Sequence, residues 1–169
     1  MNQNTKIEIV SLVDARKLFK KYKNNLKAAA VSLVKDSTDK RKIGKSLTAF
    51  CGPKFQMLLR DIKKFKCMVK YKAYEIPSIE NLNIFLDFID SLKPLNLDLL
   101  IFHCRRGVSR SSAFAIATIA YVNNISINEA IILAKEYKIT GELHKPDASI
   151  TPNDVILKQF KIILKTRKF

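Results

Sequence analysis

A short apolar run, a compact polar loop and a longer apolar run follow one another in this chain and constrain its fold more than any other feature. The first run, residues 97–102, has the length of a buried strand, whereas residues 113–122 have the pattern of a buried helix. A tight loop between a strand and a helix points backbone N–H groups into one small volume, and the helix N-terminus adds partial positive charge. The sequence therefore predicts an anion site at this junction.

A cysteine and an arginine stand six positions apart in that loop. Oriented amides, the helix N-terminus and nearby guanidinium groups are expected to lower the pKa of the Cys104 thiol, and the resulting thiolate is a nucleophile. Arg110 stands where the helix begins, and its planar guanidinium can bind two phosphate oxygens at once. Gly107 permits close approach of the loop backbone. These residue types favour a nucleophilic phosphate site.

Residues 103–111 read His-Cys-Arg-Arg-Gly-Val-Ser-Arg-Ser and resemble the His-Cys-x5-Arg-Ser/Thr signature of the cysteine-based protein tyrosine phosphatases. The closing Gly-x-Ser-Arg-Ser is most similar to the dual-specificity branch and to short bacterial members. The resemblance covers roughly residues 30–165. It implies an α/β fold with a central, mostly parallel sheet flanked by helices, in which the phosphate-binding loop joins a central strand to a buried helix. The order of strands and helices along the chain favours the same architecture.

The resemblance also implies roles for the residues of the signature. Cys104 would be the nucleophile, Arg110 would bind the phosphate and the transition state, Ser111 would assist breakdown of the phosphoenzyme, and His103 would orient the loop. A helix N-cap is the alternative role for Ser111. The expected phosphate-binding residues are Arg105, Arg106, Gly107, Val108, Ser109 and Arg110. Hydrolysis would run through a cysteinyl-phosphate and would need neither a metal nor a cofactor.

The leaving oxygen needs a proton, so a carboxylic acid from a second loop is expected. Relatives carry an Asp after a strand and before the helix that precedes the signature. Asp61 fits that order best, and Glu75 and Glu80 are the substitutes, because the basic stretch 63–72 lengthens the distance from Asp61 to the cysteine. Asp87 and Asp90 are expected on the solvated face of a helix.

The expected substrate is phosphotyrosine, with phosphoserine and phosphothreonine as further candidates, in proteins. Arg105 and Arg106 add positive charge to the loop, so a phosphoinositide or RNA 5′-triphosphate phosphatase with the same loop is an alternative. A second alternative is a catalytically weak phosphate-binding module, because the loop would bind anions even without an acid. Cys51 or Cys67 could protect Cys104 in a disulfide under oxidation, as in some relatives.

The chain of 169 residues has the length of one domain, in which residues 1–30 form a peripheral strand and helix. Three cysteines without a Cys-x2-Cys pair favour neither a disulfide framework nor a metal site. No apolar run reaches membrane-spanning length and no secretory signal is evident, so a cytoplasmic location is expected, with export as a bacterial effector left open. The oligomeric state is left open.

The net charge of +16 is concentrated in one part of the chain. Residues 1–72 hold 19 Lys/Arg against 5 Asp/Glu. Such a charge would attract phosphorylated, polyanionic or acidic-membrane-surface partners through basic residues 16–72. Codon bias towards lysine, isoleucine and asparagine is the alternative explanation.

Local signals predict most of the remaining elements. Strands are expected at residues 6–10, 31–34 and 55–62, and residues 35–45 are expected to form a polar loop. Helices are expected to start after Ser11, the candidate N-cap of the first one, and at Pro77-Ser78, Ser126 and Thr151-Pro152-Asn153. Ser126 and Glu129 also have the spacing of a capping box.

Overall fold

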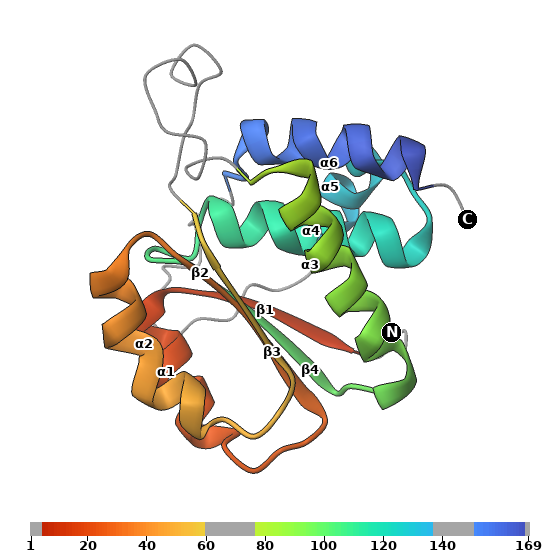
Figure 1. The fold of residues 1–169 in the computed structure, drawn as a ribbon. Helices are drawn as coiled ribbons and strands as arrows, with labels where there is room; N and C mark the ends of the chain where they lie inside the picture. Colours follow the sequence, from red (N-terminus) through yellow and green to blue (C-terminus); the bar gives the residue numbers. More distant parts are fainter. Residues whose placement is uncertain (1–4, 60–76, 137–150, 168–169) are drawn as a thin grey trace.

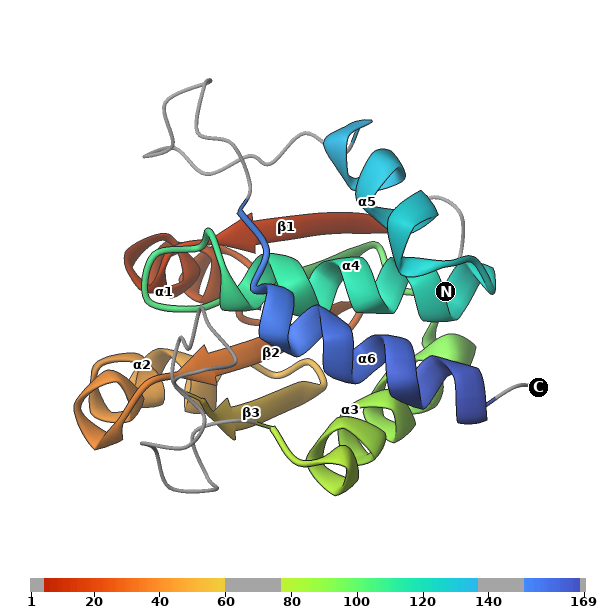
Figure 2. The same ribbon diagram turned by 90° about the horizontal axis from the view of Figure 1, so that it is seen from above.

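The computed structural model describes residues 5–59, 77–136 and 151–167 of the chain, which form three layers (Figures 1 and 2). The middle layer is a sheet of the strands β1 (Lys6–Val10), β2 (Ala28–Val34), β3 (Lys54–Leu58) and β4 (Leu99–His103). One face is covered by the helices α1 (Leu12–Lys21) and α2 (Ser37–Ala49). The other face is covered by α3 (Ile79–Leu92), followed by the 3₁₀ turn η3 (Lys93–Leu95), and by α4 (Arg110–Asn123), α5 (Ile127–Glu136) and α6 (Asp154–Thr166).

The sheet has the strand order β1-β4-β2-β3, and every pair is parallel. The last residue of β4, His103, is level with Val10 of β1 and with Ser32 of β2. The carboxyl ends of these strands therefore meet at one edge of the sheet, where parallel α/β sheets bind their ligands. The predicted fold class, a parallel sheet flanked by helices with a loop between a central strand and a buried helix, is confirmed.

Both central strands are buried along their whole length, which explains why they read as continuous apolar runs. On the face of α3 to α6 the rings of Phe85, Phe114 and Phe160 pack edge-to-face, with centroids 4.8–5.8 Å apart. On the face of α1 and α2, Phe19 and Phe50 pack at 5.3 Å. The sheet thus has a separate apolar core on each face.

The helices begin where the sequence predicts them, the caps expected at Ser11 and Ser126 are confirmed, and Ser78 and Asn153 are caps as well. Ser11 accepts a hydrogen bond from the backbone N–H of Asp14, and Ser78 accepts one from that of Asn81. Ser126 and Glu129 exchange the two hydrogen bonds of a capping box, at 2.7 and 3.2 Å. Asn153 accepts from the N–H of Ile156.

Residues 35–45 do not form the expected loop, because most of them belong to α2. Asp36 caps this helix by accepting from the N–H groups of Thr38 and Asp39, and Ile43 and Leu47 supply its buried face. Strand β2 begins at Ala28, three residues earlier than expected, and β3 ends at Leu58. No single helix in the described part of the chain is long and apolar enough to cross a membrane. Helix α4 and residues 127–134 reach the required length and apolar composition only together, and they are bent by 114° relative to one another.

Candidate active site

The loop of residues 104–109 lies at the carboxyl edge of the sheet, between β4 and α4. The backbone N–H of Leu12, at the start of α1, donates to the carbonyl of Arg105 at 3.4 Å. Gly107 has a φ of +73°, and a Cβ at this position would lie 2.5 Å from the carbonyl carbon of Val10 and 2.7 Å from the N of Ser11. Only glycine fits both the backbone angle and the space. The junction of β1 and α1 therefore packs directly against the backbone of the loop.

The thiol of Cys104 is buried and meets two donors. The backbone N–H of Gly107 donates to its Sγ at 3.2 Å, and the hydroxyl of Ser111 lies 3.3 Å from the same atom. Burial alone raises the pKa of Cys104, but the Arg110 guanidinium and the hydrogen bonds from Ser111 and Gly107 outweigh it, so the pKa lies below its ordinary value. The arrangement favours a buried thiolate.

Arg110 opens α4, and its side chain is 4% exposed. Its Nη1 donates to the backbone carbonyl of Leu59, the residue after β3, which joins the loop to the end of that strand. Its Nε meets no hydrogen-bond acceptor in the described part of the chain. A buried guanidinium N–H without an acceptor beside a thiolate is suited to bind an anionic oxygen.

Two further contacts hold the back of the loop. The hydroxyl of Ser112 donates to the carbonyls of Val108 and Ser109, at 2.5 and 2.9 Å. The backbone N–H of Asn153, at the start of α6, donates to the carbonyl of Ser109 at 3.1 Å. The sequence did not indicate the contributions of Leu59 or Asn153 to the loop, because both act through backbone atoms and neither leaves a side-chain signal.

The ring of His103 is fully buried and stands edge-on to Phe19, with the ring centroids 5.7 Å apart. Neither ring nitrogen meets a partner at full hydrogen-bond geometry in the described part. Burial lowers the pKa of His103 to about 3; the Arg110 cation adds to the shift, and the backbone of Cys104 opposes it. The ring is therefore neutral near pH 7 and does not act there as a proton donor.

The other residues of the loop have different exposures. Arg105 and Arg106 are exposed at its rim, Val108 is half-buried, and Ser109 is buried. Arg105 also affects its surroundings: the pKa of Asp36 is lowered first by the hydrogen bond from the Asp39 N–H and further by the positive charges of Lys35 and Arg105. The rim of the loop is thus positively charged.

The expected acids are divided between described and undescribed parts of the chain. Asp61 and Glu75 lie outside the described residues, whereas Glu80 is exposed in the first turn of α3. Asp87 is exposed as expected, although it pairs with Arg167, whereas Asp90 is half-buried: it accepts from the hydroxyl of Tyr121 at 2.5 Å and pairs with Lys93 and Arg167. Helix periodicity could not show this, because the partners come from α4, from the turn after α3 and from the residue that follows α6.

Cys51 is not placed to protect Cys104. Its backbone N–H donates to the carbonyl of Lys23, in the connection that leads to the amino end of β2, whereas Cys104 follows the carboxyl end of β4. A disulfide needs Cα atoms within about 7 Å, less than the length of one five-residue strand. The expectation is therefore wrong for Cys51, while Cys67 lies outside the described residues.

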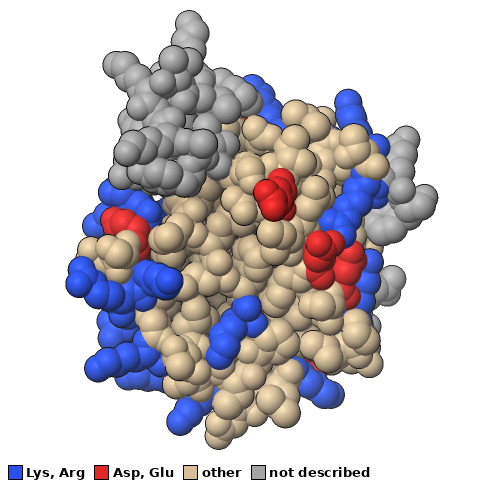
Figure 3. All heavy atoms as spheres, in the orientation of Figure 1, with Lys and Arg blue, Asp and Glu red and all other residues tan. Residues whose placement is uncertain are grey.

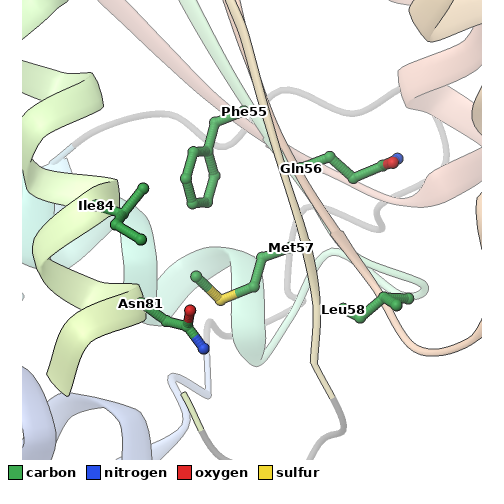
Figure 4. Close-up of a pocket in the computed structure, with 6 residues that line it drawn as sticks. All are labelled: Phe55, Gln56, Met57, Leu58, Asn81 and Ile84. Carbon is green, nitrogen blue, oxygen red and sulfur yellow. The ribbon is translucent and has the colours of Figure 1, made fainter. Parts of the chain in front are cut away.

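A cavity of about 430 Å³ lies between β3 and α3 (Figure 4). Its lining residues are Phe55, Gln56, Met57, Leu58, Asn81 and Ile84. None of them belongs to the loop of Cys104. The residues with nucleophilic and anion-binding chemistry lie in the loop, so the loop is the candidate active site.

Several solved structures with the same fold are phosphatases by their names. PTPMT1 matches with a TM-score of 0.61 and 16% identity, over 95% of this chain and 90% of that chain. PTP-2 of Cydia pomonella matches with a TM-score of 0.58 and 19% identity, over 95% and 85%. Human DUSP28 matches with a TM-score of 0.58 and 11% identity, over 96% and 95%. No protein-family model and no curated protein matches the chain.

Proposed function

Because the chain has the fold of the cysteine-based protein tyrosine phosphatases, dual-specificity members included, we propose that it is a phosphate-monoester hydrolase that works through a cysteinyl-phosphate. One observation carries the proposal. The buried thiol of Cys104 lies in a loop with Arg110, whose charge helps to lower the thiol pKa and whose Nε has no acceptor in the described residues. A nucleophile and an anion-binding group thus share one small site.

In the first step the Cys104 thiolate attacks phosphorus, so that an S–P bond forms as the P–O bond to the leaving group breaks. The loop N–H groups and Arg110 hold the three equatorial oxygens and stabilise their charge in the transition state. In the second step water attacks phosphorus, the S–P bond breaks and phosphate leaves. The hydroxyl of Ser111, 3.3 Å from Sγ, donates to the departing thiolate.

Asp61 is the acid that we propose for the leaving oxygen. The hydrogen bond from Arg110 to the carbonyl of Leu59 joins the residue after β3 to the loop. Asp61 follows Leu59 by two residues, so the extended chain limits the separation of their Cα atoms to about 7 Å. Glu80, in contrast, is exposed in α3. Asp61 also keeps the order, after a strand and before a helix, that the resemblance implies.

The first test compares Cys104→Ser with Cys51→Ser on a small aryl phosphate, with EDTA and a reductant present. We expect Cys104→Ser to lower kcat by at least about a thousandfold, because the nucleophile is lost. Cys51→Ser is the matched control and should keep full activity, because Cys51 is exposed and distant from the loop. If the wild type shows no turnover, the chain is a phosphate-binding module. If Cys104→Ser stays active, the nucleophile is misassigned.

The second test assigns the acid through the leaving group. Asp61→Asn should lower kcat on a poor leaving group, an alkyl or unactivated phenyl phosphate, by about 10²- to 10⁴-fold, and should affect an activated aryl phosphate far less. Glu75→Gln and Glu80→Gln are the controls with the same change of charge. A full rate for Asp61→Asn on the poor leaving group, together with a loss in one of the controls, would transfer the role to that residue.

Within this reaction class we propose phosphotyrosine in proteins, with phosphoserine and phosphothreonine as further substrates. A phosphoinositide is the second candidate, favoured by the exposed side chains of Arg105 and Arg106 at the rim. PTPMT1 has been solved in complex with PI(5)P and matches this chain with a TM-score of 0.60 and 15% identity. Turnover of phosphotyrosyl peptides, inositol phospholipids and triphosphate RNA should be compared. Activity on a non-protein substrate alone would exclude the protein phosphatase.

A further inference from the structure

The layer of α1 and α2 carries much of the positive charge of the molecule. Residues 11–50 contain eleven Lys/Arg and three Asp/Glu, whereas residues 77–136 and 151–167 contain nine and seven. All eleven basic side chains of the first group are exposed, and Figure 3 shows the corresponding blue surface over α1 and α2. A codon bias would raise the lysine content of both helical layers alike. The difference between the layers therefore calls for a local cause.

The three acids of this layer leave it with a net charge of +8, and two of them, Asp14 and Asp39, are buried. Asp14 is buried and shares a hydrogen bond of 2.6 Å with the Ser11 hydroxyl at the start of α1. Asp36 accepts from two N–H groups as the cap of α2. Asp39 is buried and accepts from the N–H of Lys35. All three carboxylates lie at helix N-termini, and the eleven exposed cations of the layer outnumber its one partly exposed acid, Asp36, whose pKa is lowered first by the Asp39 N–H and in part by Lys35 and Arg105.

The two helices present this charge on one continuous surface. On α1, Val13, Lys17 and Lys20 follow one another at the spacing of a single helix face, opposite the buried Ala15 and Phe19. On α2 the exposed Arg41 and Lys45 lie opposite the buried Ile43 and Leu47. Figures 1 and 2 show both helices on the same face of the sheet. We call their outer surface, with the connection 22–27, the basic face.

We propose that the basic face binds the surface of an anionic phospholipid membrane. Two aliphatic side chains stand exposed among the lysines: Val13 is 52% exposed and Leu26, between the exposed Lys23 and Lys27, is 70% exposed. Basic residues around exposed aliphatic ones are typical of an interfacial membrane contact. Single-stranded nucleic acid would instead need exposed rings for stacking; on this face Phe19 and Phe50 are buried, and Tyr22 is half-buried with Lys21 over its ring at 5.3 Å.

The basic face also adjoins the loop of Cys104. Both α1 and α2 begin at the carboxyl edge of the sheet, and the N–H of Leu12 donates to the carbonyl of the exposed Arg105. A protein bound through this face would therefore hold its loop close to the lipid headgroups. Membrane binding goes beyond the proposed hydrolysis and does not depend on it, so Cys104→Ser should bind vesicles like the wild type.

The test compares two triple variants with the same net charge. Lys20→Gln/Arg41→Gln/Lys45→Gln removes charge from the basic face, and Lys158→Gln/Lys161→Gln/Lys165→Gln removes it from α6 on the opposite layer. Binding to phosphatidylserine-containing vesicles is measured by co-sedimentation at physiological salt. We expect the first triple to weaken binding by roughly a hundredfold, at roughly fivefold for each charge near the surface, and the second to have a much smaller effect. Leu26→Gln should further weaken the binding that remains at high salt.

Three results would overturn the inference. The first is no binding of the wild type to anionic vesicles, and the second is an equal loss in both triple variants, which would reflect net charge alone. The third is tighter binding to single-stranded RNA than to vesicles, weakened in the same way by the first triple variant, which would make the basic face a nucleic-acid site. Thermal unfolding of both triples serves as the control that the fold is kept.

Discussion

At the scale of the residue, one guanidinium sets the charge state of two neighbours. Burial at the end of β4 raises the pKa of Cys104 and lowers that of His103. The cation of Arg110 lowers both values: with the hydrogen bonds from Ser111 and Gly107 it outweighs burial at the thiol, and at the imidazole it adds to burial. A thiolate and a neutral ring therefore stand side by side, and repulsion between Arg110 and an imidazolium is avoided.

The pKa of His103 gives a prediction for stability against pH. Above pH 6.5 the ring is neutral in both the folded and the unfolded chain. Between pH 6.5 and about 3, His103 binds a proton in the unfolded chain but not in the folded chain. The free energy of unfolding therefore falls as the pH falls. The loss from this group reaches about 5 kcal/mol at the acid end.

Urea unfolding of the wild type and of His103→Gln, measured from about pH 7.5 to about pH 4, tests this sign. The wild type should lose more stability than the variant, because all other titrating groups are shared. Parallel curves would show that His103 gains a proton in the folded state without cost.

At the scale of the element, α2 shows why a helix can be mistaken for a loop when only its amino-acid composition is considered. Asp36, Ser37 and Asp39 are of types common in turns as well as at helix N-termini, and Gly44 is of a type common in turns. The spacing of Ile43 and Leu47 is the signal for a helix, but two apolar positions are a weak pattern until the sheet is present to cover them. Helices with a clear cap and a longer apolar stripe, such as α3 and α6, were predicted correctly from the sequence.

Gly44 gives a prediction for this element. A Cβ built at Gly44 would meet no atom within 4 Å, and the residue lies inside α2. Gly44→Ala should therefore raise the free energy of unfolding by about 0.5–1 kcal/mol, because alanine loses less conformational freedom in a helix. Chemical denaturation measures the change. Gly107→Ala, which would press its Cβ against Val10, should be destabilising instead. A loss of stability in Gly44→Ala would contradict the helix.

At the scale of the whole molecule, a polar cluster joins three helices of one layer. The hydroxyl of Tyr121 in α4 donates to Asp90 in α3, and the pKa of Tyr121 is raised to about 12, by burial first and then by Asp90. Arg167, which follows α6, contacts Asp87 and Asp90 and donates to the carbonyl of Asn83 at 3.2 Å. Lys93 and Arg167 also lie over the Tyr121 ring, at 5.2 and 5.5 Å from its centre. The end of α6 is thereby fixed, and the start of α6 holds Ser109 in the loop.

We expect Tyr121→Phe to lower the free energy of unfolding by about 1–2 kcal/mol, because the variant removes one hydrogen bond to a charged acceptor. Tyr22→Phe is the control, since the Tyr22 hydroxyl makes no hydrogen bond to a described residue, and its effect should be near zero. Chemical denaturation of both variants makes the comparison. Equal effects would show that the contact of Tyr121 with Asp90 contributes nothing to stability.

The sequence by itself determined the parts of the molecule that contiguous residues encode. The run from residue 97 to residue 122 indicated a strand, an anion-binding loop and a helix, because the apolar periods, the glycine and the cysteine lie next to one another. The helix starts at Ser11, Ser78, Ser126 and Asn153 are local as well, because a cap acts on N–H groups two or three residues away.

Only the tertiary structure decided which distant residues contact the loop of Cys104. The packing at Val10, the acceptor at Leu59 and the support at Asn153 come from distant parts of the chain and act through backbone atoms, which every residue type possesses. The separation of Cys51 from Cys104 and the place of α1 and α2, which both begin beside the loop, also follow from parallel strands with their carboxyl ends at one edge. The residue types of the loop determine the chemistry of the site, whereas the order of the parallel strands determines which other segments surround it.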